Sequence, residues 1–289
     1  MGFRKVRPAL RHYRAQCAER QRDREIACHP RPKRMPSGAA RMNKGTRTKW
    51  SVMGTAAILG WFAPSAMSQS WQPLFNGRDF SGWVIKAKTN DQAKTFWKIE
   101  EGVIVADSLK DGQHDYVWLM TEKEYGDFIL RLKFQAFKES PGNSGVQIRS
   151  RYDDQEFWLH GPQVDIHPPG PWRTGMIWDE TRGNQRWLYP PVPKGTWVKP
   201  EMARPNLKFY YHTDQPAWNE MEITAQGTRL QAVLNGVTVM EYDGAGVLDD
   251  ETHRQRRVGL QGHIALQIHT KDRLLIKFKD IEIKELKKE

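Results

Sequence analysis

Cysteine is almost absent from this 289-residue chain, and both cysteines, Cys17 and Cys28, lie within the first 28 residues. The remainder therefore has no disulfide, no thiolate nucleophile and no cysteine-ligated zinc site. Several catalytic signatures are missing too: the sequence contains no GxxxxGK, no GxGxxG after a strand, no HExxH and no GxSxG. No long segment repeats apolar residues at a spacing of 3.6, so helices are not expected to dominate the fold.

The positive charge of the chain is unevenly distributed. The formal net charge is +11, but residues 1–49 hold 15 of the 45 basic residues and only 3 of the 34 acidic ones. The remaining 240 residues carry 30 basic and 31 acidic side chains, a net charge of −1. Nucleic-acid binding needs a basic face on the folded domain, so no nucleic-acid partner is expected.

The first 68 residues resemble a targeting segment. Residues 42–68 contain a short basic stretch, the apolar run SVMGTAAILGWFAP and a small-x-small cleavage pattern, so they predict a signal peptide. Residues 1–41 are a basic head that precedes the true start at Met42, or else a long n-region or a disordered arm. The expected mature chain, 69–289, is periplasmic or secreted. No stable membrane insertion is expected after cleavage, because the apolar run is short.

Short alternating runs dominate the mature chain. In DFILRLKFQAF, apolar and polar residues alternate, as they do in a strand with one face buried. Asn235-Gly236 predicts a two-residue hairpin turn that pairs Leu234 with Val237 and Ala232 with Val239. The apolar phase slips near Asp280, which predicts a β-bulge. These features predict one all-β domain, an antiparallel sandwich or barrel, with a long loop insertion at residues 168–206.

Three alternating runs carry an unusual polar face. The runs SGVQIRSR, PQVDIH and HIALQIH point apolar residues one way and amides, arginines, a carboxylate and imidazoles the other. Such a mixture suits a hydroxyl-bearing ligand such as a sugar, although an ordinary solvent-facing pair of strands would alternate in the same way. The polar residues are Gln147, Arg149, Gln163, Asp165, His167, Gln267 and His269, with Asn143 just before the first run.

The segment that follows adds further candidates. Asp179-Glu180 with Arg182 could be a site carboxylate held by a guanidinium, or a loop salt bridge. Trp172, Trp178 and Trp187 could stack on sugar rings or simply pack the loop.

In order along the chain, these stretches resemble the 3-keto-disaccharide hydrolase family. The resemblance covers about residues 71–286 and rests on WQPLFNGRDFSGW, FWKIEEGVIVAD, YGDFILRLKFQ, GNSGVQIRSR, PQVDI, WNEMEI with its LNG hairpin, HIALQIH and FKDIEIKEL. It implies a concanavalin A-like β-sandwich, or jelly roll, exported by bacteria that degrade glycans. It also implies hydrolase or lyase/hydratase activity on glycosides already oxidised at C3. Where many members have a glutamate, this chain has Gln163, and Asp165 is the candidate substitute.

This resemblance predicts an exported enzyme that cleaves 3-keto-glycosides by abstracting the C2 proton, eliminating the leaving group and adding water. The candidates for base or acid are Asp165, His167, Glu180 and His269. Arg149 or a divalent metal would be the electrophile. The expected substrate-binding residues are Asn143, Gln147, Arg149, Gln163, Trp178, Arg182 and Gln267. The alternative is a non-catalytic, lectin-like sandwich that binds carbohydrate.

Overall fold

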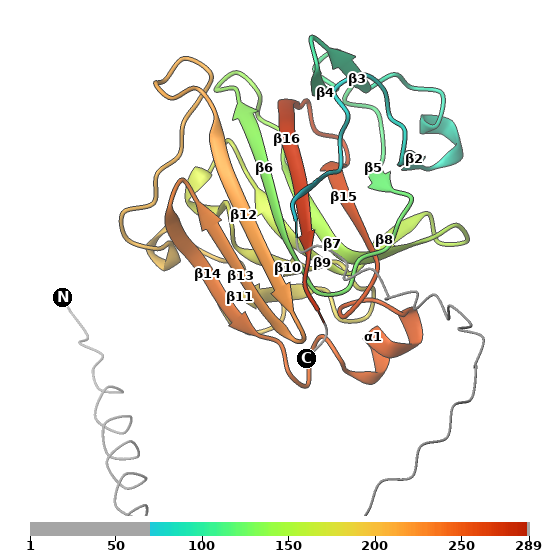
Figure 1. Cartoon of the computed structure of the whole chain (residues 1–289), viewed down its shortest axis with the longest axis vertical. Helices are drawn as coiled ribbons and strands as arrows, with labels where there is room; N and C mark the ends of the chain where they lie inside the picture. The colour runs from blue at the N-terminus through green and yellow to red at the C-terminus, as the bar shows by residue number, and fades with distance from the viewer. Residues whose placement is uncertain (1–69, 288–289) are drawn as a thin grey trace, which may run out of the picture. The chain divides into compact units, whose positions relative to one another are not determined.

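A computed structural model describes residues 70–287, and this part of the chain is built almost entirely of antiparallel strands (Figure 1). They form two eight-stranded sheets. The first sheet runs in the order β14 (Val237–Asp243), β13 (Arg229–Leu234), β12 (Asn219–Gln226), β6 (Phe128–Ala136), β16 (Leu275–Glu285), β4 (Val103–Asp107) and β3 (Trp97–Glu100), with β1 (Gln72–Pro73) paired to β16. The second runs in the order β11 (Arg186–Tyr189), β10 (Ile177–Asp179), β9 (Pro162–Ile166), β7 (Ser144–Asp153), β15 (His263–Ile268), β5 (Val117–Thr121) and β2 (Trp83–Ala87), with β8 (Trp158–His160) paired to β7.

The core lies between the two sheets. Leu130 and Phe134 from β6 and Val146 and Ile148 from β7 are fully buried in one apolar cluster. They alternate with residues that point away from it, because successive side chains in a strand lie on opposite faces. The predicted all-β antiparallel sandwich is confirmed. The one α-helix of the described residues, α1 (Glu251–Arg256), follows β14.

The predicted hairpin is present, with one difference in register. Asn235 and Gly236 both have positive φ, 49° and 77°, as a type I′ turn requires, and Leu234 pairs with Val237. Ala232, however, pairs with Met240 and not with Val239. The register shifts between Ala232 and Val233, so an irregularity that the alternation did not reveal moves the partner by one residue.

The bulge predicted near Asp280 is also confirmed. The pairing of β16 with β6 shifts between Lys279 and Glu282, and Asp280 has a φ of 50°. The extra residue lets Phe278 and Ile281 both reach the core although their spacing is odd.

The long loop expected at 168–206 is interrupted by two short strands. It contains β10 and β11, which extend the second sheet, and the short 3-10 helices η2 (Pro171–Arg173) and η3 (Pro200–Met202). A third 3-10 helix, η1 (Thr89–Asp91), lies after β2. β10 and β11 have only 3 and 4 residues, too short to show periodicity in the sequence.

The basic head, 1–41, and the signal peptide, 42–68, lie outside the described residues. Among residues 70–287, no helix has the length and apolar character needed to cross a bilayer.

Candidate functional site

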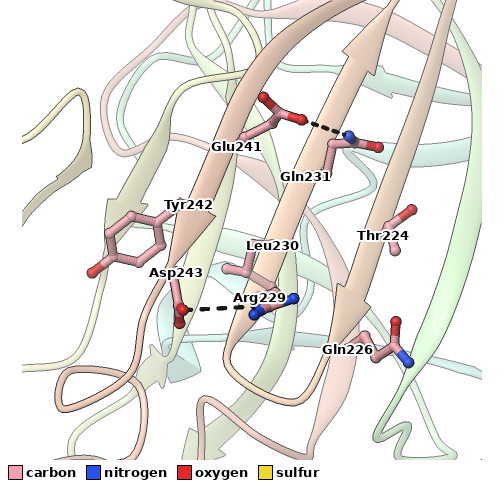
Figure 2. A pocket seen from close by; sticks show the side chains of 8 residues that line it. All are labelled: Thr224, Gln226, Arg229, Leu230, Gln231, Glu241, Tyr242 and Asp243. Atoms are coloured by element: carbon pink, nitrogen blue, oxygen red, sulfur yellow. Dashed lines mark hydrogen bonds and ion pairs between the residues drawn. The ribbon is translucent and has the colours of Figure 1, made fainter. Parts of the chain in front are cut away.

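The outer face of the first sheet is an ordinary solvent-facing surface. Figure 2 shows a shallow hollow there, formed by β12, β13 and β14. Gln231 donates a hydrogen bond of 3.1 Å to Glu241, and Arg229 forms a 3.9 Å ion pair with Asp243 across the neighbouring strands. Both members of the ion pair are largely exposed. Exposed pairs of this kind contribute little, and they leave no polar group in need of a ligand.

The outer face of the second sheet is different, because its amides are buried and incompletely paired. Gln147, Gln163 and Gln267 are all buried. The side-chain oxygens of all three, and the nitrogen of Gln267, have no hydrogen-bond partner among the described residues. Gln147 donates to the Leu159 carbonyl at 3.0 Å. Buried polar atoms are nearly always satisfied, so these orphaned atoms indicate a place for a polar ligand or ordered water.

Strand register places the predicted residues on this one face. Gln147 lies opposite Gln163 on β9 and Ala265 on β15, while Asp165 lies opposite Gly145. Residues two apart share a face, so Gln147 and Asp165 point the same way, as does His269, four residues after Ala265. The three runs with the polar face all belong to one sheet.

Gly145 makes room for one of the amides. A Cβ atom at this position would lie 2.5 Å from Cδ of Gln163, far inside contact distance. The missing side chain therefore lets the Gln163 amide lie across β7. Only glycine allows this packing with the present side chain of Gln163.

Asp165 points away from the apolar core, as the alternation predicts, but it is buried and paired. It is 2% exposed, and its Oδ2 atom accepts a 2.6 Å hydrogen bond from Nε of Arg173 in η2. Arg173 was not predicted, because nothing in a PWR stretch within a proline-rich segment indicates that its side chain folds back. A carboxylate fixed by this ion pair is suited to holding the neighbouring η2 segment in position.

Glu180 is the most perturbed carboxylate of the face. It is 5% exposed, and burial raises its pKa to about 7, against the opposing influence of Trp178, the charge of His269, Gln267 and Gln185. The expected guanidinium partner is absent. Arg182 instead pairs with Glu156 at 3.1 Å and lies over the Trp158 ring at 4.6 Å. Glu180 therefore titrates near neutral pH.

His269 lies in a chain of three hydrogen-bonding groups. Its Nδ1 is 3.2 Å from Oδ2 of Asp272, and its Nε2 is 3.0 Å from the hydroxyl of Tyr116. Burial alone would lower the pKa of His269, but the bond to Asp272 and the charges of Asp272, Glu180 and Asp165 raise it. Asp272 also accepts from the backbone N–H of Asn143 at 2.8 Å. Asp272 and Tyr116 were not predicted, although Asp272 follows His269 by only three residues.

His167 is less suited to carry charge. Its Nδ1 accepts a 3.0 Å hydrogen bond from the backbone N–H of Gly170. Burial and the nearby Arg173 lower its pKa. The imidazole is therefore neutral at pH 7 and serves as a hydrogen-bonding group in this arrangement.

Arg149 is not on the Gln147 face, and its expected role as electrophile is not supported. It has a φ of 48° at a shift in the β7–β15 register, which reverses the alternation. Its guanidinium is buried, donates to the Gly126 carbonyl at 2.7 Å and pairs with Asp127 at 2.8 Å.

The donor set for a divalent metal does not fit this face. Within residues 70–287, three His, Asp or Glu donors come within 4.8 Å of one another only at Asp153, Glu156 and His160. The Arg256 guanidinium already contacts all three, at 3.2, 2.7 and 3.0 Å. Among the described residues, a divalent metal therefore has no ligand cluster beside Glu180.

Aromatic residues that sequence reasoning missed border the amides. Trp118 stacks on Tyr116 at 5.5 Å and meets Trp158 edge-on at 6.0 Å. Trp118 and Gln267 are directly opposite each other on β5 and β15. The indole N–H of Trp118 has no acceptor within the described part of the chain. The alternation of Tyr116 and Trp118 in YVW was the available signal.

Fold and site together define a β-sandwich protein with a buried face of amides, carboxylates and aromatic rings on one sheet. The chain belongs to the 3-keto-alpha-glucoside-1,2-lyase-like domain family, whose model matches residues 70–284. The resemblance seen in the sequence is confirmed, and membership supports a role on carbohydrates.

Solved structures with similar folds have low sequence identity to this chain. One is described as a "putative glycosyl hydrolase" from Parabacteroides distasonis, with 20% identity, 76% of this chain and 95% of that chain covered, and a TM-score of 0.48. Another is carbohydrate binding module CBM66 from Bacillus subtilis, with 12% identity, 71% and 96% coverage and a TM-score of 0.39. A third is a Bacillus subtilis protein of unknown function with a galectin-like fold, with 10% identity, 76% and 96% coverage and a TM-score of 0.42. No curated protein matches the chain significantly.

Proposed function

We propose that this protein is an exported enzyme that cleaves 3-keto-glycosides by elimination followed by hydration. The observation that carries the proposal is Glu180: a buried carboxyl with a pKa of about 7, on a face with unpaired amides and a hydrogen-bonded histidine. A general base works best when its pKa lies near the working pH. Family membership supports the same substrate class.

The chemistry follows from the ketone at C3, which acidifies the C2–H bond. A base takes the C2 proton, and the electron pair moves into a C2–C3 enolate with the negative charge on the C3 oxygen. The enolate then expels the C1 substituent, which leaves with a proton from an acid, and a C1–C2 enone remains. Water adds its hydroxyl at C1 and a proton at C2, so the net result is hydrolysis.

Residues of the face can fill each role. Glu180, once ionised, is the candidate base. His269, whose pKa Asp272 raises, is the candidate acid for the leaving oxygen. The unpaired indole N–H of Trp118 could donate to the enolate oxygen together with the Gln267 amide, which lies in register on the neighbouring strand and close to Glu180. Two aimed donors of this kind are the usual means of stabilising an oxyanion.

The remaining polar residues of the face would hold the substrate. The Asp165–Arg173 pair fixes the η2 segment against β9. The amides of Gln147 and Gln163, with Asn143, would bind sugar hydroxyls through oxygens that lack a partner in the described structure. Amide groups both donate and accept, which suits hydroxyls.

Export is part of the proposal and rests on the head of the sequence. The basic, apolar and small-residue order of residues 42–68 fits a cleaved signal peptide. N-terminal sequencing of protein recovered outside the cytoplasm should find a chain that begins near Gln69. A cytoplasmic chain that still begins at Met1 would overturn this part of the proposal.

The direct test is incubation with a 3-keto-glycoside and, in parallel, with its unoxidised parent. We expect aglycone release from the keto compound alone, and a rate loss on the order of 10²–10⁴ in Glu180→Gln. The matched control is Glu222→Gln, whose carboxylate pairs with Arg131 on the opposite sheet. Sugar binding without release, unchanged by Glu180→Gln, would favour the lectin-like alternative.

A further inference from the structure

A second hollow lies at the edge of the second sheet. It has a volume of about 440 Å³, within the usual range for a small-molecule site. Trp178 in β10, Trp187 in β11 and Trp197 in the loop that follows β11 all line it. The reaction proposed above acts on the sugar that carries the ketone, and the group that leaves from C1 needs a place beside that sugar.

Strand register puts this hollow on the same face of the sheet as the buried amides. Trp187 lies opposite Trp178, and Trp178 lies opposite Gln163. Gln163 in turn lies opposite Gln147. Residues directly opposite each other in an antiparallel pair have side chains on the same face. One row of side chains therefore runs from the tryptophans to the amides.

Glu180 lies next to this row. It follows Trp178 by two residues, just past the end of β10, and its backbone N–H donates to the Gly161 carbonyl at 2.9 Å. Residues two apart in an extended segment share a face. Trp178 and Gln185, which both line the hollow, also interact with the Glu180 carboxyl group and oppose the rise in its pKa. A group bound in the hollow would thus lie beside a sugar held at Glu180.

Three indoles make the hollow aromatic. The ring centroids of Trp178 and Trp187 are 5.2 Å apart, and those of Trp187 and Trp197 are 5.3 Å apart. The Arg173 guanidinium lies 5.2 Å from the centroid of Trp197. Trp197 is nevertheless 56% exposed, which is unusual for so large an apolar side chain. An exposed indole held by two other rings is suited to contact with a further aromatic ring.

The polar side chains around the hollow are engaged with the protein or directed elsewhere. The Lys194 ammonium donates to the Gly183 carbonyl at 3.0 Å, and the Thr196 hydroxyl donates to a backbone carbonyl three residues earlier. Arg186 precedes Trp187 in β11 and so points to the other face of the sheet. None of the described residues that line the hollow carries a carboxylate. A sugar ring would lose hydrogen bonds to water here without regaining them, whereas an uncharged aromatic ring needs none.

We propose that the hollow formed by Trp178, Trp187 and Trp197 binds an uncharged aromatic ring carried by the leaving group of the substrate. The exposed ring of Trp197 makes the contact that selects the aromatic group. Binding of the ring rests on the hollow alone, while its role as leaving group rests on the proposed function. The substrate class is then a glycoside with an aromatic aglycone.

Calorimetric titration of the whole protein with glucosides of one anomeric form tests the binding claim. We expect benzyl glucoside to bind at least tenfold more tightly than methyl glucoside. It should bind about threefold more tightly than cyclohexylmethyl glucoside, because aromatic pairs contribute beyond the area that they bury. A glucosyl-glucose disaccharide should bind no more tightly than methyl glucoside, because its second ring needs hydrogen-bond partners.

Variants of Trp197 locate the aromatic contact. Trp197→Ala should weaken binding of benzyl glucoside about tenfold and leave methyl glucoside unaffected, while Trp197→Phe should retain most of the benzyl affinity. Trp197 is exposed, so its loss should not impair folding, and a thermal melt checks this. The matched control is Trp218→Ala, which removes an indole under the Lys279 ammonium at the first sheet and should change neither affinity.

Three results would overturn the proposal. One is equal affinity for benzyl glucoside and either methyl or cyclohexylmethyl glucoside. Another is a disaccharide that binds as tightly as benzyl glucoside, since the hollow would then hold a sugar. The third is benzyl affinity that Trp197→Ala leaves unchanged.

Turnover separates this inference from the proposed function. The 3-keto derivatives of benzyl and cyclohexylmethyl glucoside release alcohols of similar acidity, so their intrinsic chemistry is comparable. Trp197→Ala should raise KM for the benzyl substrate and change kcat little. Selective benzyl binding without turnover of any 3-keto-glycoside would retain the aromatic site and refute the reaction. Turnover with equal kinetics for the two substrates would retain the reaction and refute the aromatic site.

Discussion

Arg173 reaches back from η2 to Asp165 on β9, and the 2.6 Å contact buries both charges. Removing one partner leaves the other charge buried and unpaired, which typically costs about 3–5 kcal/mol. Asp165→Asn should therefore lower the free energy of unfolding by roughly 3 kcal/mol, measured by urea denaturation.

The exposed Arg131–Glu222 pair provides the control for this prediction. Glu222→Gln should change stability by less than about 1 kcal/mol, because exposed pairs are worth little. If Asp165→Asn had an effect as small as Glu222→Gln, the carboxylate would not be a structural anchor, and a direct chemical role would become the better interpretation.

Gly145 and Gln163 should be energetically coupled. Gly145→Ala places a Cβ 2.5 Å from Gln163 Cδ and should lower stability by about 1–3 kcal/mol through overpacking. In a Gln163→Ala background the same change should cost much less. A double-mutant cycle from thermal melts measures this coupling, and additive effects would show that the two side chains do not compete for one space.

The pKa of Glu180 should make the stability of the protein depend on pH. The ordinary value of 4.5 is raised to about 7 in the folded chain, so the unfolded chain releases this proton first. The contribution of Glu180 to stability therefore falls as pH rises from about 4.5 to about 7. Glu180→Gln removes this pH-dependent destabilisation. The free energy of unfolding of the variant should exceed that of the wild type by up to about 3 kcal/mol at pH 8 and differ little at pH 4.

Denaturation curves at the two pH values check this prediction. Glu222→Gln, which alters an exposed carboxylate, is the control for the effect of net charge. A gain in Glu180→Gln that is equal at pH 4 and pH 8 would contradict a raised pKa at this site.

Asp272 should hold the protonated form of His269. The carboxylate lies 3.2 Å from Nδ1 and raises the pKa against the effect of burial. Asp272→Asn should therefore lower the pKa of His269, as an NMR titration of the imidazole would show. Asp154→Asn, at an exposed carboxylate, should not move it. If Asp272→Asn left the pKa of His269 unchanged, Asp272 would not stabilise the protonated imidazole, and the role of His269 as acid would lose its support.

Alternation predicted the two sheets and most of the polar face, because period-two burial is written directly in the sequence. It placed Gln147, Gln163 and Gln267 correctly outside the core. It failed for Arg149, where a backbone irregularity turns one residue over inside an otherwise regular run.

Contacts between distant segments were beyond the reach of the sequence. The pairing of Asp165 with Arg173 and that of Arg182 with Glu156 depend on how a proline-rich segment folds back. The raised pKa of Glu180 depends on its burial, which no local pattern encodes. These ion pairs and this pKa were therefore accessible only in three dimensions.

The most direct test of the reaction is the isotope content of C2 in the product. Elimination and hydration replace the C2 proton, whereas direct hydrolysis leaves that bond intact. In D₂O, wild-type protein acting on a 3-keto-glycoside should yield a product with deuterium at C2, beyond any exchange in a protein-free sample. The rate should rise through about pH 7 as Glu180 ionises, and fall at higher pH as His269 loses its proton. Glycoside cleavage that leaves the C2 proton in place would contradict the account.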